Sequence, residues 1–369
     1  MKYYIIAGEA SGDLHGSNLM KGLFAEDPGC DVRFWGGSLM AAVGGTLVRD
    51  YAEGAVMGVT DVLKKARKLL GNIEFCKKDI LEWQPDVVIL IDYPGFNLKI
   101  AEFAHSQGLK VFYYIAPKTW ASREGRNRKL KMWVDRLFII FPFEVPYFES
   151  KGLSFSYVGN PLVDAVDQYE YSPVDSSSEG YVALLAGSRK GEISRMMPVC
   201  MQVADRLGRK VIVAGAPSRT MEDYSKYIGS RKNVEVVFGR TYDVLRYADA
   251  AIINSGTASL EAALIGTPQV VCWSTSFVTA VVAGVFLQVL KHVKYISLGN
   301  LILDRGAWKE LIQFDFTADK VYDEVQRLLS DEAYRSQMLS DYAEIRQRLG
   351  GTGASRAVAR AMISELKKS

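Results

Sequence analysis

Short apolar runs alternate with helix-length amphipathic segments, and this alternation constrains the fold more than any other feature of the sequence. In the first half, apolar runs predict strands at Tyr3–Ala7, Val32–Trp35, Val87–Ile91, Val111–Ile115 and Leu137–Phe141. Helical patterns between them occupy Leu14–Phe24, Leu98–Gln107 and Arg126–Trp133. Strands joined by helices form right-handed crossovers, which make the strands parallel. The pattern therefore predicts an α/β sheet with helices on both faces.

The alternation stops after Pro161 and restarts beyond a polar, serine-rich segment, Gln168–Gly180. Later strands are predicted at Val182–Ala186, Val211–Ala214, Val234–Phe238, Ala250–Ile253 and Val270–Trp273. A chain of 369 residues accommodates two domains of about 150 residues. We predict two doubly wound, Rossmann-like domains facing a central cleft. Their expected bounds are residues 1–162 and 181–345, with a linker at 163–180 and a helical tail at 346–369.

Composition narrows the function classes. Apolar residues make up 49% and charged residues 24%, as in ordinary globular proteins, so wholesale disorder is excluded. A net charge of +3 gives no reason to expect nucleic-acid binding. Four widely spaced cysteines without a CxxC pair indicate neither a zinc site nor a disulfide scaffold, and a reduced cytosolic protein is the simplest interpretation. The start MKYYIIAGEASGD predicts a buried strand and a turn rather than a signal peptide.

Ligands of doubly wound sheets bind beyond the carboxyl ends of the strands, so the residues that follow each strand are the candidates. After the first strand comes GEASGD, in which Gly8 and Gly12 allow a tight turn close to a ligand. Ser11 or Asp13 could cap the next helix. The segment is neither a Walker A loop nor a dinucleotide fingerprint. A plain strand-to-helix turn is the alternative.

Asp92 follows the apolar run Val87–Ile91 directly. A carboxylate on the rigid end of a buried strand is well placed to act as a general base towards a ligand in the cleft. A structural carboxylate that accepts hydrogen bonds from loop N–H groups is the equal alternative.

Small residues and two cations follow the first strand of the second half, in GSRKGE. Ser188 and Arg189 would stand at a helix N-terminus, where backbone N–H groups, the helix dipole and a guanidinium attract phosphate. A solvated basic turn is the alternative interpretation.

The stretch NSGTASLE is the most informative one. Ser255, Gly256 and Thr257 are predicted at a helix N-terminus, which can hold a diphosphate without a metal ion. Glu261 lies about one turn further on and could accept both hydroxyls of a ribose. The alternative is a capped helix with a buried or solvated glutamate, although the apolar residues after Glu261 make that glutamate unusual.

Two longer segments have a surface or interface character. Val62–Trp83 is amphipathic and basic, as in helices that lie on anionic bilayers, although an ordinary surface helix has the same pattern. Phe277–Leu290 is apolar nearly all round, which indicates burial or packing against another subunit or a membrane. No stretch reaches the roughly 18 apolar residues of a spanning helix.

A set of motifs along nearly the whole chain carries a resemblance to a known family. They are AGEASGD (Ala7–Asp13), FWGGSLM (Phe34–Met40), AVMG (Ala55–Gly58), IDYPGFN (Ile91–Asn97), IAPKTWA (Ile115–Ala121), PFE (Pro142–Glu144), YVGNPL (Tyr157–Leu162), AGSRKGEI (Ala186–Ile193), SGTASLEAALIGTPQVV (Ser255–Val271) and ISLGNLI (Ile296–Ile302). The chain resembles the lipid-A-disaccharide synthase family, inverting glycosyltransferases with the two-domain GT-B fold. Gly95 and Asn160 depart from the family's frequent acidic and histidine residues.

The resemblance implies a reaction in lipid A assembly. UDP-2,3-diacylglucosamine and 2,3-diacylglucosamine 1-phosphate would give a β-1,6-linked disaccharide 1-phosphate and UDP. It also implies action at the cytoplasmic face of the Gram-negative inner membrane, as a peripheral protein. A homodimer through the C-terminal halves is known in the family, and Phe277–Leu290 is compatible with it.

Site roles follow from the motifs and the resemblance together. Asp92 is expected to be the base. The expected UDP-sugar site comprises Ser188, Arg189, Ser255, Gly256, Thr257 and Glu261. The acceptor or the cleft is expected to meet Glu9, Ser11, Gly12, Asp13 and Asn300. No cofactor and no metal ion are expected, because a helix N-terminus can replace a divalent ion.

Three other functions compete with this prediction. Another GT-B enzyme acting on a UDP-sugar, such as a UDP-N-acetylglucosamine epimerase, would share the diphosphate site and differ on the acceptor side. A non-catalytic nucleotide-sugar-binding protein would not need Asp92. A nicotinamide dehydrogenase is disfavoured by the missing G-x-G-x-x-G.

Overall fold

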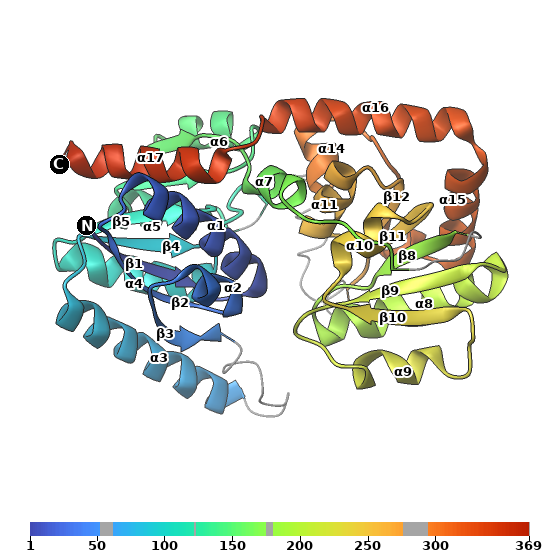
Figure 1. Cartoon of the computed structure of the whole chain (residues 1–369), viewed down its shortest axis with the longest axis horizontal. Coiled ribbons are helices and arrows are strands. Elements are labelled where there is room, and N and C mark those ends of the chain that lie inside the picture. The colour runs from blue at the N-terminus through green and yellow to red at the C-terminus, as the bar shows by residue number, and fades with distance from the viewer. Residues whose placement is uncertain (52–61, 122, 175–179, 276–293, 369) are drawn as a thin grey trace. The chain divides into compact units, whose positions relative to one another are not determined.

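The computed structural model describes residues 1–51, 62–121, 123–174, 180–275 and 294–368. The motif Ala55–Gly58 and the apolar segment Phe277–Leu290 lie outside the described residues. The chain forms two compact units (Figure 1). Unit 1 comprises Met1–Ala165 together with Leu349–Ser369, and unit 2 comprises Val166–Arg348.

Unit 1 contains a sheet of seven parallel strands in the order β3-β2-β1-β4-β5-β6-β7. Its strands are β1 (Lys2–Ala7), β2 (Asp31–Gly36), β3 (Thr46–Asp50), β4 (Val87–Ile91), β5 (Lys110–Tyr114), β6 (Arg136–Ile139) and β7 (Phe155–Tyr157). The strand order reverses between β1 and β4. Ala7 at the end of β1 pairs with Ile91 at the end of β4, so the loops that follow these strands begin side by side.

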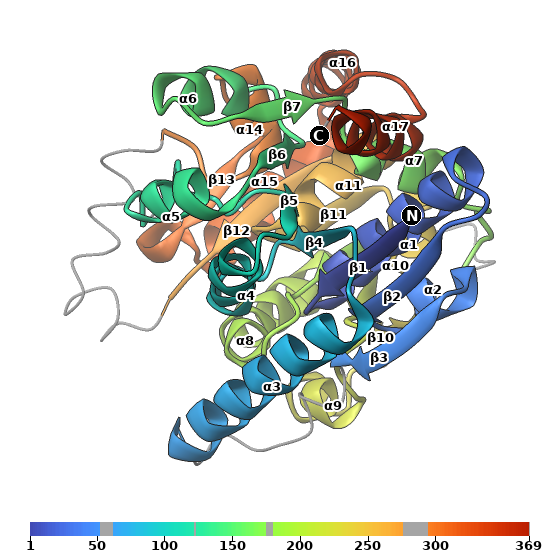
Figure 2. The ribbon, with the colours of Figure 1, turned by 90° about the vertical axis from the view of Figure 1, so that its left-hand side faces the viewer.

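Helices cover both faces of this sheet (Figure 2). On one face, alternate residues of the central strands share a core with helices α3 to α6, so the two-residue period of the strands divides the unit into layers. These helices are α3 (Val62–Trp83), α4 (Pro94–Ser106), α5 (Arg126–Trp133) and α6 (Glu144–Ser150). The other face carries α1 (Ala10–Glu26), α2 (Ser38–Val43) and α17 (Ala354–Lys367), of which α17 lies along α1.

Unit 2 contains a second parallel sheet, in the order β10-β9-β8-β11-β12-β13. Its strands are β8 (Tyr181–Leu185), β9 (Lys210–Gly215), β10 (Val234–Phe238), β11 (Ala250–Asn254), β12 (Gln269–Trp273) and β13 (Glu310–Ile312). Its described helices are α8 (Lys190–Leu207), α9 (Glu222–Ile228), α10 (Thr241–Arg246), α11 (Thr257–Ile265), α14 (Leu298–Leu303), η2 (Gln313–Asp315), α15 (Ala318–Ser330) and α16 (Glu332–Leu349). The order reverses between β8 and β11, where Leu185 pairs with Ile253.

The predicted strands all form, with ends that differ by at most two residues. The prediction missed β3, β7 and β13, which lie at sheet edges and lack a buried apolar run. The linker expected from residue 163 begins later, because helix α7 (Pro161–Asp167) continues to residue 167. The tail does not stand apart, since α17 belongs to unit 1. Within the described part of the chain, no helix is both long enough and apolar enough to cross a membrane.

Candidate functional site

In unit 1 the loop after β4 is held in an unusual backbone conformation. Asp92 and Tyr93 both have positive φ, at 43° and 46°. The Asp92 N–H donates to the carbonyl oxygen of Tyr114 (3.1 Å), and the Asp92 carbonyl oxygen accepts from the Asn97 amide (2.8 Å). The Tyr113 hydroxyl donates to the same carbonyl oxygen. Left-handed conformations are costly for residues other than glycine, and they persist where neighbouring groups fix them, often at functional sites.

The Asp92 carboxyl lies in an environment that favours its neutral form. Partial burial raises the pKa of Asp92, and the nearby carboxylate of Glu9 raises it further. The positive charges of Lys118 and Arg126 oppose this shift. Lys118 follows β5, so the carboxyl ends of β1, β4 and β5 all bring charge to Asp92. A carboxylate whose pKa is raised by burial is a stronger base than an exposed one.

The loop after β1 packs directly against the loop after β4. A side chain at Gly8 would meet the Tyr93 ring at 2.3 Å, so glycine is required for this contact. Glu9 and Ser11 are exposed beside it, while Gly12 is buried against the Ala7 side chain. The structure therefore brings Glu9 together with Asp92.

Asp13 has a different position from the one predicted. Its buried carboxylate accepts hydrogen bonds from the N–H groups of Gly37 (2.8 Å), Leu39 (3.1 Å) and Met40 (3.0 Å), at the start of α2. The prediction that Ser11 or Asp13 caps the helix that follows β1 is wrong, because α1 begins at Ala10 without a side-chain cap. Asp13 instead fixes the neighbouring α2.

In unit 2 the loop after β8 holds an internal carboxylate. The N–H groups of Ser188 and Arg189 donate to Glu192 Oε2 (3.0 and 3.1 Å), and Arg189 Nη1 donates to Glu192 Oε1 (3.0 Å). The Arg189 side chain is 72% exposed, so it can leave this pair for a ligand. The loop thus binds one anion already, which agrees with the anion preference expected of a helix N-terminus. The sequence analysis did not single out Glu192.

The loop after β11 lies beside the loop after β8. Gly187 has a φ of 99°, which favours glycine, and a β-carbon there would come within 2.7 Å of the Asn254 amide nitrogen. Ser255, Gly256 and Thr257 are partly exposed at the start of α11. Because Gly256 is the N-cap residue, it brings no side chain of its own to the first N–H groups of α11. Within the described residues, no three histidine, cysteine, aspartate or glutamate side chains are grouped to hold a metal ion.

Glu261 is fixed by a tyrosine that the sequence analysis missed. The Tyr242 hydroxyl donates to Glu261 Oε1 at 3.0 Å. Burial raises the pKa of Glu261, and the hydrogen bond from Tyr242 opposes that shift. The Tyr242 ring in turn packs against Tyr169, with ring centroids 5.1 Å apart. These contacts hold the Glu261 carboxyl in one orientation on α11.

Asn300 is fully buried in unit 2. Its amide nitrogen donates to the Trp308 carbonyl oxygen (3.2 Å) and to Glu310 Oε1 (2.9 Å), and its oxygen accepts from the Ala307 N–H (2.8 Å). These contacts join α14 to the turn before β13 and to β13 itself. Asn300 belongs to unit 2, whereas Glu9, Ser11, Gly12 and Asp13 belong to unit 1.

Sequence reasoning also missed a buried carboxyl at the start of α6. Glu144 accepts from the N–H groups of Ile140 (3.2 Å) and Phe141 (3.1 Å) and from the Trp120 indole (3.2 Å). Burial raises the pKa of Glu144 to about 7, although these hydrogen bonds favour the charged form. Asn160 donates to the Ile140 carbonyl oxygen at 2.9 Å, so its role is to fix the same turn.

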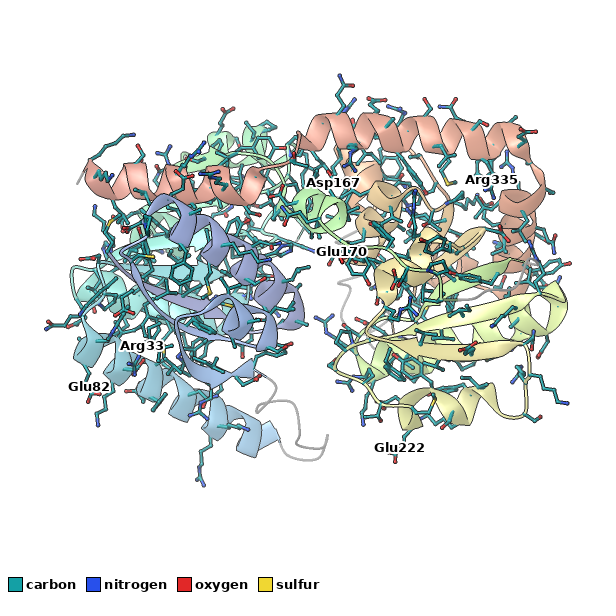
Figure 3. The ribbon with its side chains drawn as sticks, viewed as in Figure 1. Arg33, Glu82, Asp167, Glu170, Glu222 and Arg335 are labelled. Atoms are coloured by element: carbon teal, nitrogen blue, oxygen red, sulfur yellow. The ribbon has the colours of Figure 1, made fainter. Side chains whose placement is uncertain are left out.

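Helix α3 has the bounds predicted for the amphipathic segment, and its apolar stripe packs on the sheet. Ile73 and Ile80 are buried, and Asp79 on α3 accepts from Arg33 on β2. Figure 3 labels Arg33 and, on α3, Glu82. Leu70 and Leu81 are 54% and 47% exposed. On this outer side Lys78 pairs with Glu82, and Lys77 pairs with Glu74. Leu63, Lys64 and Lys65 lie outside the residues whose side chains are described.

A family model described as lipid-A-disaccharide synthetase matches residues 3–362. The chain belongs to this family. It is therefore a glycosyltransferase. It is 37% identical to a lipid-A-disaccharide synthase of Trichlorobacter lovleyi, over 99% of this chain and 97% of the relative. It is 38% identical to the one of Geobacter metallireducens, with the same coverage of both chains.

Solved structures support the fold of a synthetase of this family. A UDP-GlcNAc 2-epimerase from Neisseria meningitidis superposes with a TM-score of 0.72, at 13% identity, over 99% of this chain and all of the other. A glycosyltransferase from Streptomyces nogalater gives a TM-score of 0.57, at 19% identity, over 99% of both chains. The predicted GT-B fold of two doubly wound domains is thus confirmed.

Proposed function

We propose that the chain joins two diacylated glucosamine units, with UDP-2,3-diacylglucosamine as donor and 2,3-diacylglucosamine 1-phosphate as acceptor. The products are a β-1,6-linked disaccharide 1-phosphate and UDP. The family match over residues 3–362 carries this proposal. The chemistry of the residues at the two positions where strand order reverses supports it.

Unit 1 supplies the base. Asp92 takes the proton of the acceptor 6-hydroxyl while that oxygen attacks the anomeric carbon of the donor. The environment of Asp92 suits this task, because burial favours protonation and the left-handed backbone is fixed by three hydrogen bonds. Glu9 and Ser11 lie on the neighbouring loop, where they are available to the acceptor.

Unit 2 binds the nucleotide. The bond between the anomeric carbon and the diphosphate breaks, and its electron pair leaves with UDP. The N-terminus of α11, with Ser255, Gly256 and Thr257, stabilises this charge, and Arg189 adds a guanidinium after it leaves Glu192. Glu261, oriented by Tyr242, accepts hydrogen bonds from the ribose hydroxyls. Direct displacement by the acceptor oxygen inverts the configuration at the anomeric carbon.

The substrates carry acyl chains, so we also propose that the chain acts at the cytoplasmic surface of the inner membrane. Exposed Leu70 and Leu81 on α3, with the exposed cation Arg67, support peripheral binding to an anionic surface. The homodimer through the C-terminal halves stays a prediction, because Phe277–Leu290 lies outside the described residues.

The deciding experiment incubates the protein with both acylated substrates in the presence of EDTA, followed by mass spectrometry. We expect the disaccharide 1-phosphate, because α11 and Arg189 supply the positive charge that the diphosphate needs. Loss of product in EDTA that magnesium restores would reject the metal-free mechanism. Epimerisation of UDP-N-acetylglucosamine without disaccharide formation would support the epimerase instead.

A further inference from the structure

A pocket opens in unit 1 at the carboxyl ends of β1, β2 and β3, beside the loop that carries Asp92. Its inner walls include Ile6, Trp35, Tyr93 and Phe96. Ile6, Trp35 and Phe96 also belong to the core between the sheet and helices α3 to α6. The inner side of the pocket therefore reaches the hydrophobic core of unit 1.

The aromatic side chains of the walls present carbon surfaces. The Trp35 ring lies 5.3 Å from Phe96, and Tyr93 stacks on Phe96 at 5.6 Å. The indole nitrogen of Trp35 already donates to the Tyr4 hydroxyl at 2.9 Å, and that hydroxyl donates to Asp79. A sugar or a nucleobase against these aromatic walls would lose hydrogen bonds to water without replacing them, whereas a hydrocarbon chain would lose none.

The rim of the pocket is charged. Arg49 lies over the Trp35 ring at 5.8 Å, and Lys68 of α3 lies on the same rim, together with Asp50. A ligand with an apolar chain and a polar, anionic head fits this distribution of apolar walls and charged rim. Tyr93 follows Asp92 in the chain, so a head group at the rim lies close to the loop of the proposed base.

We infer that this pocket binds a fatty-acyl chain of the acceptor, with the acylated sugar phosphate at its rim. The inference rests on the proposed function and adds to it the place that selects the acyl length. Because the pocket belongs to the same unit as Asp92, we assign it to the acceptor rather than to the donor.

Asn72 offers a way to fill the pocket without changing its inner walls. It lies on α3 at the pocket, is partly exposed, and stands outside the buried stripe of that helix. Asn72→Trp places an indole in the opening. Glu102→Trp is the matched control, because it adds the same side chain to an exposed position of α4 that does not line the pocket. Asn72→Leu adds less bulk and serves if Asn72→Trp fails to fold.

The measurement is kcat/KM against acyl length, varied separately on acceptor and donor. For the parent we expect a rise of about fourfold for each acceptor methylene group that the pocket buries. Asn72→Trp should flatten this dependence for the acceptor alone, with Asn72→Leu intermediate and Glu102→Trp like the parent. UDP affinity should stay unchanged in all three variants.

Three results would overturn the assignment. One is an unchanged acceptor dependence in a folded Asn72→Trp variant. Another is an equal loss with short and long acceptors, which indicates a structural effect. The third is flattening for the donor instead. Failure of the proposed function gives a different result, because the parent itself then forms no disaccharide. In that case the pocket assignment fails as well.

Discussion

At the scale of single residues, one arrangement occurs in both units. In each unit, a glycine that follows the first strand leaves room for a residue at or just beyond the end of the fourth strand. In unit 1 Gly8 leaves room for Tyr93, and in unit 2 Gly187 leaves room for Asn254. A β-carbon would come within 2.3 Å of the Tyr93 ring or 2.7 Å of the Asn254 amide. Because glycine has no side chain, the loop with the proposed base and the loop with the proposed diphosphate site can each pack closely against the loop beside it.

Replacement of Asp92 tests the proposed base. We expect Asp92→Asn to lower kcat by about 10²–10⁴-fold, because a general base contributes about that much. UDP affinity should stay unchanged, because the proposed nucleotide residues belong to unit 2. Asp31→Asn is the control, since Asp31 is exposed at the amino end of β2. A variant with near-parental kcat would show that Asp92 is not the base.

The pH profile gives the same prediction a second measurement. Burial raises the pKa of Asp92, so the active carboxylate becomes protonated at a higher pH than an exposed aspartate does. As the pH falls, kcat/KM of the parent should therefore decline before the usual aspartate range is reached. The residual activity of Asp92→Asn should lack this decline.

UDP affinity tests the unit 2 assignments. Arg189→Ala and Glu261→Ala should each weaken UDP binding by about 10–150-fold, the range of one charge-assisted hydrogen bond. Calorimetry with UDP measures it, with Arg206→Ala as control, because Arg206 forms an exposed ion pair with Asp319. If both variants bind UDP as the parent does, the nucleotide site lies elsewhere.

The buried polar contacts of these sites could not be predicted from the sequence. Asp92 and Glu261 stand out because each polar residue adjoins apolar ones within its own segment. Glu144, Glu192 and Tyr242 give no comparable local signal, and their roles depend on where the chain folds back: Tyr242, for example, reaches Glu261 from a different helix. Asp13 was predicted to cap the helix that contains it, because the sequence does not show that the start of α2 packs against its carboxylate.

At the scale of elements, the predictable features are those with a repeating pattern. The strands β4 and β10 and the helices α3 and α5 were predicted with the bounds observed, since their apolar residues recur at the spacing of a strand or helix. The edge strand β3 has no fully buried residue, so it shows no such pattern. Which side of α3 meets the core was equally hidden, because both sides carry leucines.

We expect only the outer side of α3, and not the whole helix, to contact the membrane. Leu70→Ser together with Leu81→Ser should reduce co-sedimentation with phosphatidylglycerol-rich vesicles and raise KM for long-chain acceptor. The fold should be retained, because both side chains are exposed. Leu339→Ser, at an exposed position of α16, is the control. Unchanged vesicle binding would show that α3 is an ordinary surface helix. The ion pairs Lys78–Glu82 and Lys77–Glu74 would then serve only to keep its surface polar.

At the scale of the whole molecule, unit 1 is assembled from both ends of the chain. Gly22 of α1 lies so close to α17 that a β-carbon would come within 2.8 Å of the Ser355 carbonyl oxygen. Glu26 at the end of α1 pairs with Arg356 and Arg360. The Asp164 carboxylate accepts from the Ser355 N–H at 2.8 Å. Three separate stretches of sequence are thus joined at the start of α17.

Two helical glycines make this contact testable. Gly22→Leu should lower the free energy of unfolding by about 1–3 kcal/mol, because the added side chain has no room between α1 and α17. Gly71→Ala should instead raise it by about 1 kcal/mol, since nothing lies within 4 Å of that position and alanine favours the helix. Denaturant titration of the full-length chain measures both. Equal effects of the two substitutions would show that α17 does not pack tightly on α1.

The return of α17 to unit 1 also sets the order in which a growing chain can complete its parts. The ribosome makes β1 to β7 first, then all of Val166–Arg348, and only then the helix that covers α1. At about 5–20 residues per second the interval is roughly ten to forty seconds. During that time unit 1 lacks α17 and exposes the apolar surface around Gly22. Unit 1 is therefore the first to begin forming and the last to be completed.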